Sequence, residues 1–164
     1  MGGGIPIIRP LYHCLMGERI EEITGILNGT TNYILTKMDK EGDTFENALR
    51  EAQNLGYAER NPEADVEGYD TCRKIAILTA MAAGKEVDYQ DIYTEGITKI
   101  TDVDFKYAEK MGVSIKLFGT SRIRDGKVSA YVAPVMINSS HPLYGVRDAV
   151  SYTHLRAHET GRNL

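Results

Sequence analysis

The chain has 164 residues, of which 42% are hydrophobic and 26% are charged, and its formal net charge is −4. This composition is typical of one globular domain, and the interspersed charges of both signs exclude a strongly basic protein that binds nucleic acid. No apolar run reaches the roughly 18–20 residues that cross a bilayer, and the start lacks the layout of a signal peptide, so we expect a cytoplasmic protein without a membrane partner.

Apolar spacing predicts the elements of the first half of the chain. A short helix is expected over residues 5–16, because proline is tolerated in a first helical turn. A strand is expected over residues 19–27, where isoleucines alternate with charged residues. Thr30 or Thr31 is then expected to cap a helix that reaches about residue 40. Thr44 is expected to cap the next helix, over residues 45–55.

The second half combines helical and extended patterns. Helices are expected over residues 66–83 and 102–111, with a looser stretch between them. Residues 113–123 and 127–137 are rich in strand-forming residues, and the Asp125-Gly126 pair between them favours a hairpin. Helices mixed with hairpin-connected strands predict an α+β domain, with an open mixed or antiparallel sheet and helices on one face.

The segment from residue 52 to residue 74 is the most informative for function. It contains Lys74 and four carboxylates, which are Glu59, Asp65, Glu67 and Asp70. Asp70 and Lys74 are four residues apart, so on a helix their side chains share one face. A lysine held by an acid, beside further acids, suits proton transfer and the binding of a cationic amine. The simpler interpretation is an ordinary surface ion pair with solvated acids around it.

This segment also resembles a known family. The spacing of ten positions matches the motif of homoserine dehydrogenases, at Ala52, Gly56, Tyr57, Asn61, Pro62, Asp65, Val66, Gly68, Asp70 and Lys74. Three flanking stretches resemble the catalytic domain of the same family, which are GGGIPIIRPL, ITGILNGTTNYIL and HPLYGV. The resemblance covers residues 2–150.

The resemblance implies NAD- or NADP-dependent interconversion of L-homoserine and L-aspartate 4-semialdehyde, in the biosynthesis of threonine, methionine and isoleucine. It assigns Lys74 as the general acid and base, and Asp70 as the group that orients it. A hydride added to a carbonyl carbon leaves an oxygen that must be protonated, which is a suitable role for a positioned lysine.

The same resemblance assigns residues around the substrate. Glu59 and Asp65 would receive its ammonium group, and charge-assisted hydrogen bonds of that kind are strong. Gly29 and Thr30 would border the substrate and the nicotinamide end of the cofactor, and Tyr57, beside Glu59, would line the same pocket. For Thr30, simple capping of a helix is the alternative interpretation, and both roles are compatible.

The family also holds a monovalent cation such as Na⁺ on backbone carbonyls, and Gly3 and Ile5 match those positions. A homodimer is expected from the same resemblance. The family's dinucleotide-binding Rossmann domain has no counterpart in this sequence, so we expect residues 1–150 to be a substrate-binding and dimerisation domain that is inactive alone. Residues 151–164 resemble translated cloning sequence, and we expect a non-native, disordered tail there.

Two other classes stay open from the sequence. One is a non-catalytic module that binds an amino acid or drives oligomerisation. The other is a part of an aspartokinase–homoserine dehydrogenase fusion. A strand–GxGxxG–helix unit upstream in the parent gene would favour the enzyme, and a kinase domain further upstream would favour the fusion.

Overall fold

The computed structural model describes residues 7–13 and 20–157. Its helices are α1 (Ile8–His13), α2 (Gly29–Glu41), α3 (Phe45–Asn54), α4 (Glu63–Val66), α5 (Tyr69–Ala83), the short 3₁₀ helix η1 (Tyr89–Asp91) and α6 (Asp102–Met111). Its strands are β1 (Ile20–Ile26), β2 (Tyr93–Thr94), β3 (Val113–Arg124), β4 (Lys127–Asn138) and β5 (Tyr152–Ala157). None of the described helices is long and apolar enough to cross a membrane.

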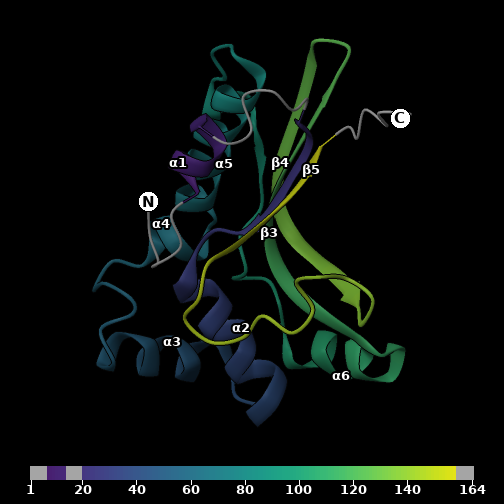
Figure 1. Cartoon of the computed structure of the whole chain (residues 1–164). Coiled ribbons are helices and arrows are strands. Elements are labelled where there is room, and N and C mark those ends of the chain that lie inside the picture. Colours follow the sequence, from purple (N-terminus) through teal and green to yellow (C-terminus); the bar gives the residue numbers. More distant parts are fainter. Residues whose placement is uncertain (1–6, 14–19, 158–164) are drawn as a thin grey trace.

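The strands form one open, mixed sheet in the order β2-β4-β3-β1-β5 (Figure 1). β2 is parallel to β4, and the other neighbours are antiparallel. The hairpin between β3 and β4 turns at Asp125 and Gly126, which have φ angles of 49° and 72°. Both angles are positive, as a type I′ turn requires, and this confirms the predicted hairpin. The predicted α+β class is confirmed as well.

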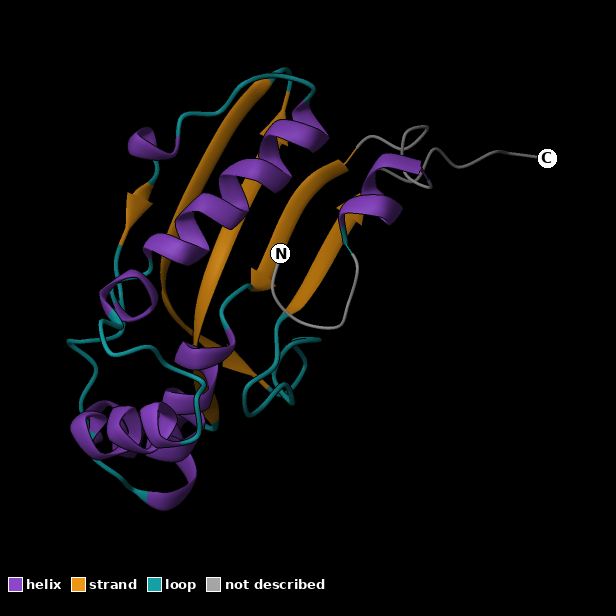
Figure 2. Ribbon diagram, turned by 90° about the vertical axis from the view of Figure 1, so that its left-hand side faces the viewer, coloured by secondary structure: helices purple, strands orange, loops and turns teal. Residues whose placement is uncertain are grey.

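Helix α5 lies across one face of the sheet and contacts β1, β3 and β4 (Figure 2). Its close approach depends on Gly119 in the middle of β3. A Cβ atom at this position would lie 3.1 Å from carbon atoms of Ile75, Leu27 and Thr71. Helices α2, α3 and α6 gather at the lower end of the sheet in Figure 1, so the helical layer covers one face and one end.

The other face of the sheet is partly covered by the segment after β4. Phe118 and Ile26 pack there against Leu143, which is fully buried. Lys116 is also buried on β3, and its Nζ atom donates to the carbonyl oxygen of Val146 at 2.6 Å. Burial lowers the pKa of Lys116 from its ordinary value of 10.5 to about 8. This lysine therefore ties the segment to the sheet.

Two predicted helix starts are wrong. Asn28, and neither Thr30 nor Thr31, caps α2, because its side chain accepts a hydrogen bond from the backbone N–H of Thr31. The helix expected over residues 66–83 begins only at Tyr69, as α5, and Val66 instead ends the short helix α4. Gly68 separates them with a φ of 83°, a left-handed conformation that cannot continue a right-handed helix. The predicted cap Thr44 and the predicted helix Asp102–Met111 are confirmed.

The expectation of disorder after residue 150 is wrong for residues 152–157, which form β5 and pair antiparallel with β1. An edge strand is stabilised by backbone hydrogen bonds, and these need no particular side chains. Strand β2 was not predicted, since two residues are too short to show a periodic pattern.

Candidate active site

The candidate site is centred on the first turns of α5. The Nζ atom of Lys74 lies 2.6 Å from Oδ2 of Asp70 and 3.0 Å from the carbonyl oxygen of Leu27. The Lys74 and Asp70 side chains are only 18% and 30% exposed. An ammonium group has three N–H bonds, and two of them are used by these partners. The third N–H remains for a ligand, so Lys74 is held in place and still has one hydrogen-bond donor to offer.

Asn28 joins this pair to a second carboxylate. Its side-chain Nδ2 atom donates to Asp65 Oδ1 at 2.7 Å and to Asp70 Oδ2 at 2.8 Å. Asn28 was not among the residues that the sequence singled out for the site. Its position before the Gly-Thr-Thr start of a helix is a capping signal, but nothing local indicates a contact with residues 37 and 42 positions away.

The environment of Asp65 raises the pKa of its carboxyl group. Burial is the main reason that the pKa of Asp65 is raised from its ordinary value of 3.8, and the charges of Asp70 and Glu59 raise it further. The hydrogen bond from Asn28 and the charge of Lys74 lower the pKa. The two aspartates, the lysine and the asparagine therefore form one electrostatically coupled group.

Thr30 contacts Tyr57 through the backbone of Tyr57 and not through its side chain. The Thr30 hydroxyl donates to the carbonyl oxygen of Tyr57 at 2.6 Å, which fixes the loop after α3 against the first turn of α2. The Tyr57 ring packs edge-on to Tyr33 at a centroid distance of 5.1 Å. Tyr33 in turn donates from its hydroxyl to Glu51 at 2.9 Å. The Tyr57 side chain remains 47% exposed and free to contact a ligand.

The other predicted residues are placed less closely. Gly29 opens α2, and a Cβ atom there would lie 3.2 Å from the carbonyl group of Ala149, so a larger residue would push on that segment. Glu59 is exposed, and its carboxylate makes no hydrogen bond or ion pair with another described residue, although its charge acts on Asp65. The candidate cation ligands Gly3 and Ile5 lie outside the described residues. Among the residues that are described, no cluster of three or more His, Cys, Asp or Glu side chains is suited to a metal ion.

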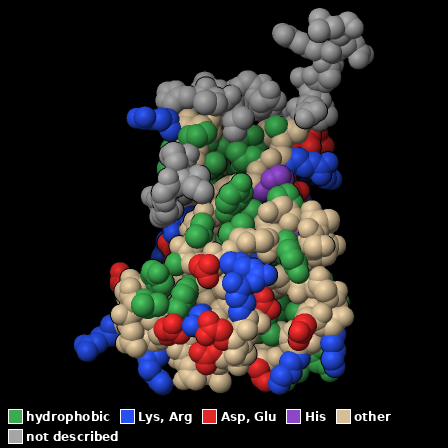
Figure 3. Space-filling view, turned by 60° about the horizontal axis from the view of Figure 1, so that its bottom comes forward, with side chains coloured by type: hydrophobic (Ala, Val, Ile, Leu, Met, Phe, Trp, Pro, Cys, Tyr) green, Lys and Arg blue, Asp and Glu red, His purple; other side chains and the backbone are tan. Residues whose placement is uncertain are grey.

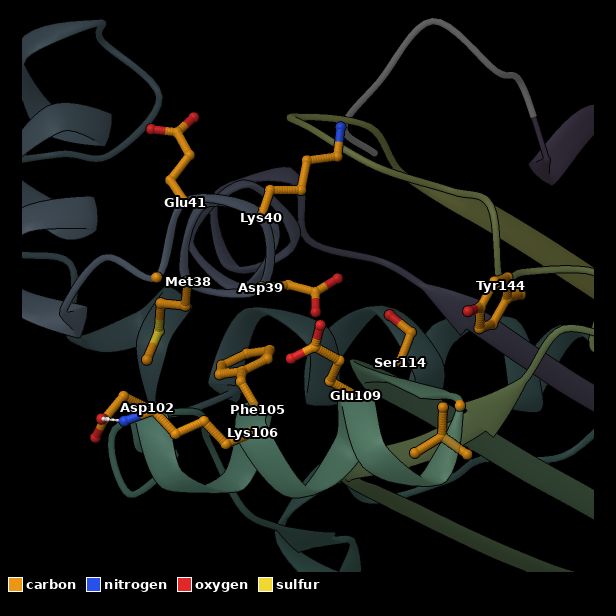
Figure 4. Close-up of a pocket in the computed structure, with 13 residues that line it drawn as sticks. Met38, Asp39, Lys40, Glu41, Asp102, Phe105, Lys106, Glu109, Ser114 and Tyr144 are labelled. Carbon is orange, nitrogen blue, oxygen red and sulfur yellow. Dashed lines mark hydrogen bonds and ion pairs between the residues drawn. The ribbon is translucent and has the colours of Figure 1, made fainter.

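A cavity of about 580 Å³ opens elsewhere, between the end of α2 and α6. Figure 4 shows Asp39 and Glu109 pointing toward one another across it, with Ser114 beside them. Lys74, Asp65 and Asp70 are not among the residues that line it. The chemistry of the lysine–carboxylate group, and not cavity volume, therefore identifies the candidate active site.

The lower end of the molecule, where α2, α3 and α6 gather, carries intermixed acidic and basic side chains (Figure 3). A polyanion such as nucleic acid is bound by a continuous basic surface. The face seen in Figure 3 therefore lacks the charge pattern of a nucleic-acid-binding surface.

Comparisons with known proteins agree with this chemistry. The family model of homoserine dehydrogenase matches residues 6–164. The chain is 40% identical over 164 residues to the homoserine dehydrogenase of Bacillus subtilis, and the match covers 100% of this chain and 38% of that relative. It is 47% identical over 167 residues to the enzyme of Mycobacterium leprae, covering 99% of this chain and 38% of that relative.

Solved structures give the same result. The crystal structure of a homoserine dehydrogenase from Thiobacillus denitrificans is similar with a TM-score of 0.91 and 40% identity, over 97% of this chain and 37% of that one. A hyperthermophilic archaeal homoserine dehydrogenase mutant in complex with NADPH has a TM-score of 0.76 and 31% identity, over 97% of this chain and 44% of that one. The chain thus spans about 38% of the length of the first curated relatives that it matches.

Proposed function

Because the chain belongs to the homoserine dehydrogenase family, we propose that it forms the substrate-binding part of an oxidoreductase that interconverts L-homoserine and L-aspartate 4-semialdehyde. The observation that carries this proposal is Lys74, held 2.6 Å from Asp70 with one N–H unused. The reaction would belong to the biosynthesis of threonine, methionine and isoleucine, in the cytoplasm.

Lys74 is the proton donor to the substrate oxygen when the semialdehyde is reduced, and it takes the proton back when homoserine is oxidised. Asp70 keeps the ammonium group oriented through the 2.6 Å ion pair. The Leu27 carbonyl holds the same nitrogen from a second direction, so the unused N–H has a defined direction. Such positioning converts a weak acid into an effective catalyst.

The carboxylates hold the amino-acid end of the substrate. Asp65 of α4 and Asp70 of α5 accept hydrogen bonds from the same side chain, that of Asn28, and Glu59 acts on Asp65 by its charge. An α-ammonium group offers three donors, which two or three carboxylate oxygens satisfy. Tyr57, Gly29 and Thr30 would shape the wall of this pocket.

NAD or NADP would supply the hydride chemistry when bound. The NADPH in a related archaeal structure supports this cofactor class. The described residues contain no strand–GxGxxG–helix unit, so we propose that the dinucleotide is held mainly by another part of the enzyme. Within this chain, Gly29 and Thr30 at the start of α2 are the candidates to border the nicotinamide. The Na⁺ site at Gly3 and Ile5 remains a prediction, which the dependence of activity on added Na⁺ would test.

The proposed function is tested by joining this chain to the dinucleotide-binding part of the Bacillus subtilis relative and measuring homoserine-dependent reduction of NADP. We expect turnover by the chimera and none by the chain alone. A folded chimera that binds NADP but does not oxidise homoserine would contradict the proposal and favour a non-catalytic amino-acid-binding module.

We also propose that the chain forms a homodimer, as the family resemblance implies. Tyr131 and Tyr152 are 37% and 43% exposed on the sheet face opposite α5, and such aromatic side chains are frequent in interfaces. Light scattering of the purified chain should give twice its mass of 18.2 kDa. A mass that stays at the monomer value at all concentrations would contradict this.

A further inference from the structure

Asn28 has an unusual set of partners for a helix cap. It is 5% exposed, it accepts from the backbone N–H of Thr31, and it donates to two carboxylates. The orientation of its amide group follows from chemistry. A backbone N–H can only donate, so Oδ1 must face Thr31, and ionised carboxylates can only accept, so Nδ2 must face Asp65 and Asp70.

The contacts decide which carboxylate oxygens are free. Oδ2 of Asp70 receives hydrogen bonds from both Asn28 and Lys74. Oδ1 of Asp65 receives the other Asn28 hydrogen. No described residue donates to the second oxygen of either aspartate, so one oxygen of each acid remains for a ligand.

The charges around Asn28 are unbalanced. Asp65, Asp70 and the nearby Glu59 are acids, and among the described residues the only cation that pairs with any of them is Lys74, which is bonded to Asp70. Like charges at short distance favour protonation of one partner. A neutral amide donor opposes protonation without adding a positive charge, so it leaves the net negative charge available for a cationic ligand. A lysine or arginine at residue 28 would instead repel such a ligand.

We propose that Asn28 is a positioning residue, which keeps Asp65 and Asp70 ionised and directs one free oxygen of each toward the same ligand ammonium group. The identity of the ligand, an amino acid, rests on the proposed function. The ionisation of the two carboxylates does not depend on it. Asparagine is suited to the position because one side chain caps α2 and bridges the acids. Aspartate keeps the cap but has no donor, and serine keeps the cap but cannot bridge.

The first measurement is a pH titration of the Asp65 and Asp70 carboxyl carbons by NMR in this chain, for the natural protein, Asn28→Asp and Asn28→Ser. We expect Asn28→Asp to shift the titration of the pair upward by about one pH unit or more, because it replaces two donors by a third acid. Asn28→Ser should shift it in the same direction by less. Unchanged titration in either folded variant would overturn the inference.

The second measurement is the pH dependence of kcat/KM in the chimera described above. The acidic limb of the profile should move to higher pH in both variants, and KM for homoserine should rise about tenfold in Asn28→Ser, while a merely structural cap would leave the limb in place. Asn47→Asp is the matched control, because Asn47 donates to Asp43 at 3.1 Å on the exposed side of α3, away from the site.

The two proposals fail in different ways. A natural chimera without homoserine turnover, with carboxyl titrations that still shift in the variants, would contradict the proposed enzyme and support the role of Asn28 toward the acids. An active chimera whose pH profile is unaffected by Asn28→Ser would support the enzyme and overturn the role of Asn28. If Asn28→Asp unfolds, as thermal denaturation would reveal, Asn28→Ser alone decides the matter.

Discussion

The ammonium nitrogen of Lys74 donates to the carbonyl oxygen of Leu27 at 3.0 Å, which links the second turn of α5 to the residue that follows β1. Leu27 directly precedes the cap of α2, so this bond also fixes α5 relative to α2. The side chain of Leu27 is buried beneath the same region. Lys74, the proposed proton donor, is therefore positioned by the end of β1 as well as by its acidic neighbour Asp70.

Lys74→Ala should reduce kcat of the chimera by about 10²–10⁴-fold, the usual effect of removing a general acid and base. Lys74→Arg should be nearly as inactive, because a guanidinium group keeps its proton near neutral pH. Lys106→Ala is the matched control, since Lys106 forms the same i,i+4 pair with Asp102 on exposed α6, at 2.8 Å. Equal losses in Lys74→Ala and Lys106→Ala would contradict the assignment.

Thr30→Val should raise KM for homoserine about fivefold, because a lost hydrogen bond of about 1 kcal/mol would release the Tyr57 loop from α2. Thr79→Val removes a bond of the same kind, since the Thr79 hydroxyl donates to the Ile75 carbonyl at 2.6 Å within α5. Steady-state kinetics of the two variants make the comparison. A KM that rises equally in both would show general loosening of the fold.

Gly119→Ala should lower the free energy of unfolding by about 1–3 kcal/mol, the usual effect of overpacking. The new methyl group would lie 3.1 Å from atoms of Ile75, Leu27 and Thr71. Urea denaturation measures the change, and Gly145→Ala is the control because a Cβ atom there meets nothing within 4 Å. The kcat of the chimera should fall too, since Leu27 holds Lys74. Stability unchanged by Gly119→Ala would contradict the tight contact between α5 and β3.

The stability of the protein should increase between pH 8 and pH 10.5 because of Lys116. Its pKa in the folded state is about 8, below its ordinary value of 10.5, so the unfolded chain binds more protons in this window. The lowered pKa disfavours folding fully below pH 8, and this disadvantage disappears as pH rises through the window. The gain should approach roughly 3 kcal/mol.

Lys116→Met should lack this gain, as urea denaturation at a series of pH values would measure. Lys127→Met is the control, because Lys127 is exposed at the start of β4. Parallel stability curves for the natural protein and Lys116→Met would show that Lys116 does not titrate in this way.

Local signals account for what the sequence predicted well. Thr44 at a helix start and Asp125-Gly126 in a hairpin act on their own neighbours, and the structure has them in those roles. The Asp70–Lys74 contact is also local, since residues four apart on one helix lie side by side. These features need no knowledge of the tertiary fold.

The remaining features depend on tertiary contacts that no short pattern reveals. Asn28 reaches Asp65 and Asp70 only because β1 and α5 pack together, and the carbonyl of Leu27 carries no side-chain signal at all. The residues of β5 lack an apolar pattern and therefore predict a tail, although they form a strand that pairs with β1. Backbone groups, such as the carbonyl of Leu27 and the hydrogen bonds of β5, therefore make contacts that the side-chain pattern does not predict.

The position of β1 in the sheet has a consequence for synthesis on the ribosome. β1 pairs with β3 and β5, and the bond between Glu22 and Arg122 spans 100 residues of sequence. While residues 20–112 emerge, this strand has no described partner, and long loops close slowly because of their entropy. Leu27 and Asn28 directly follow β1, so the strand that leads into the lysine–carboxylate group gains its partners in the sheet only after the residues of that group have been made. A nascent chain arrested before β3 is expected to expose an unpaired hydrophobic strand and to depend on chaperones until that hairpin appears.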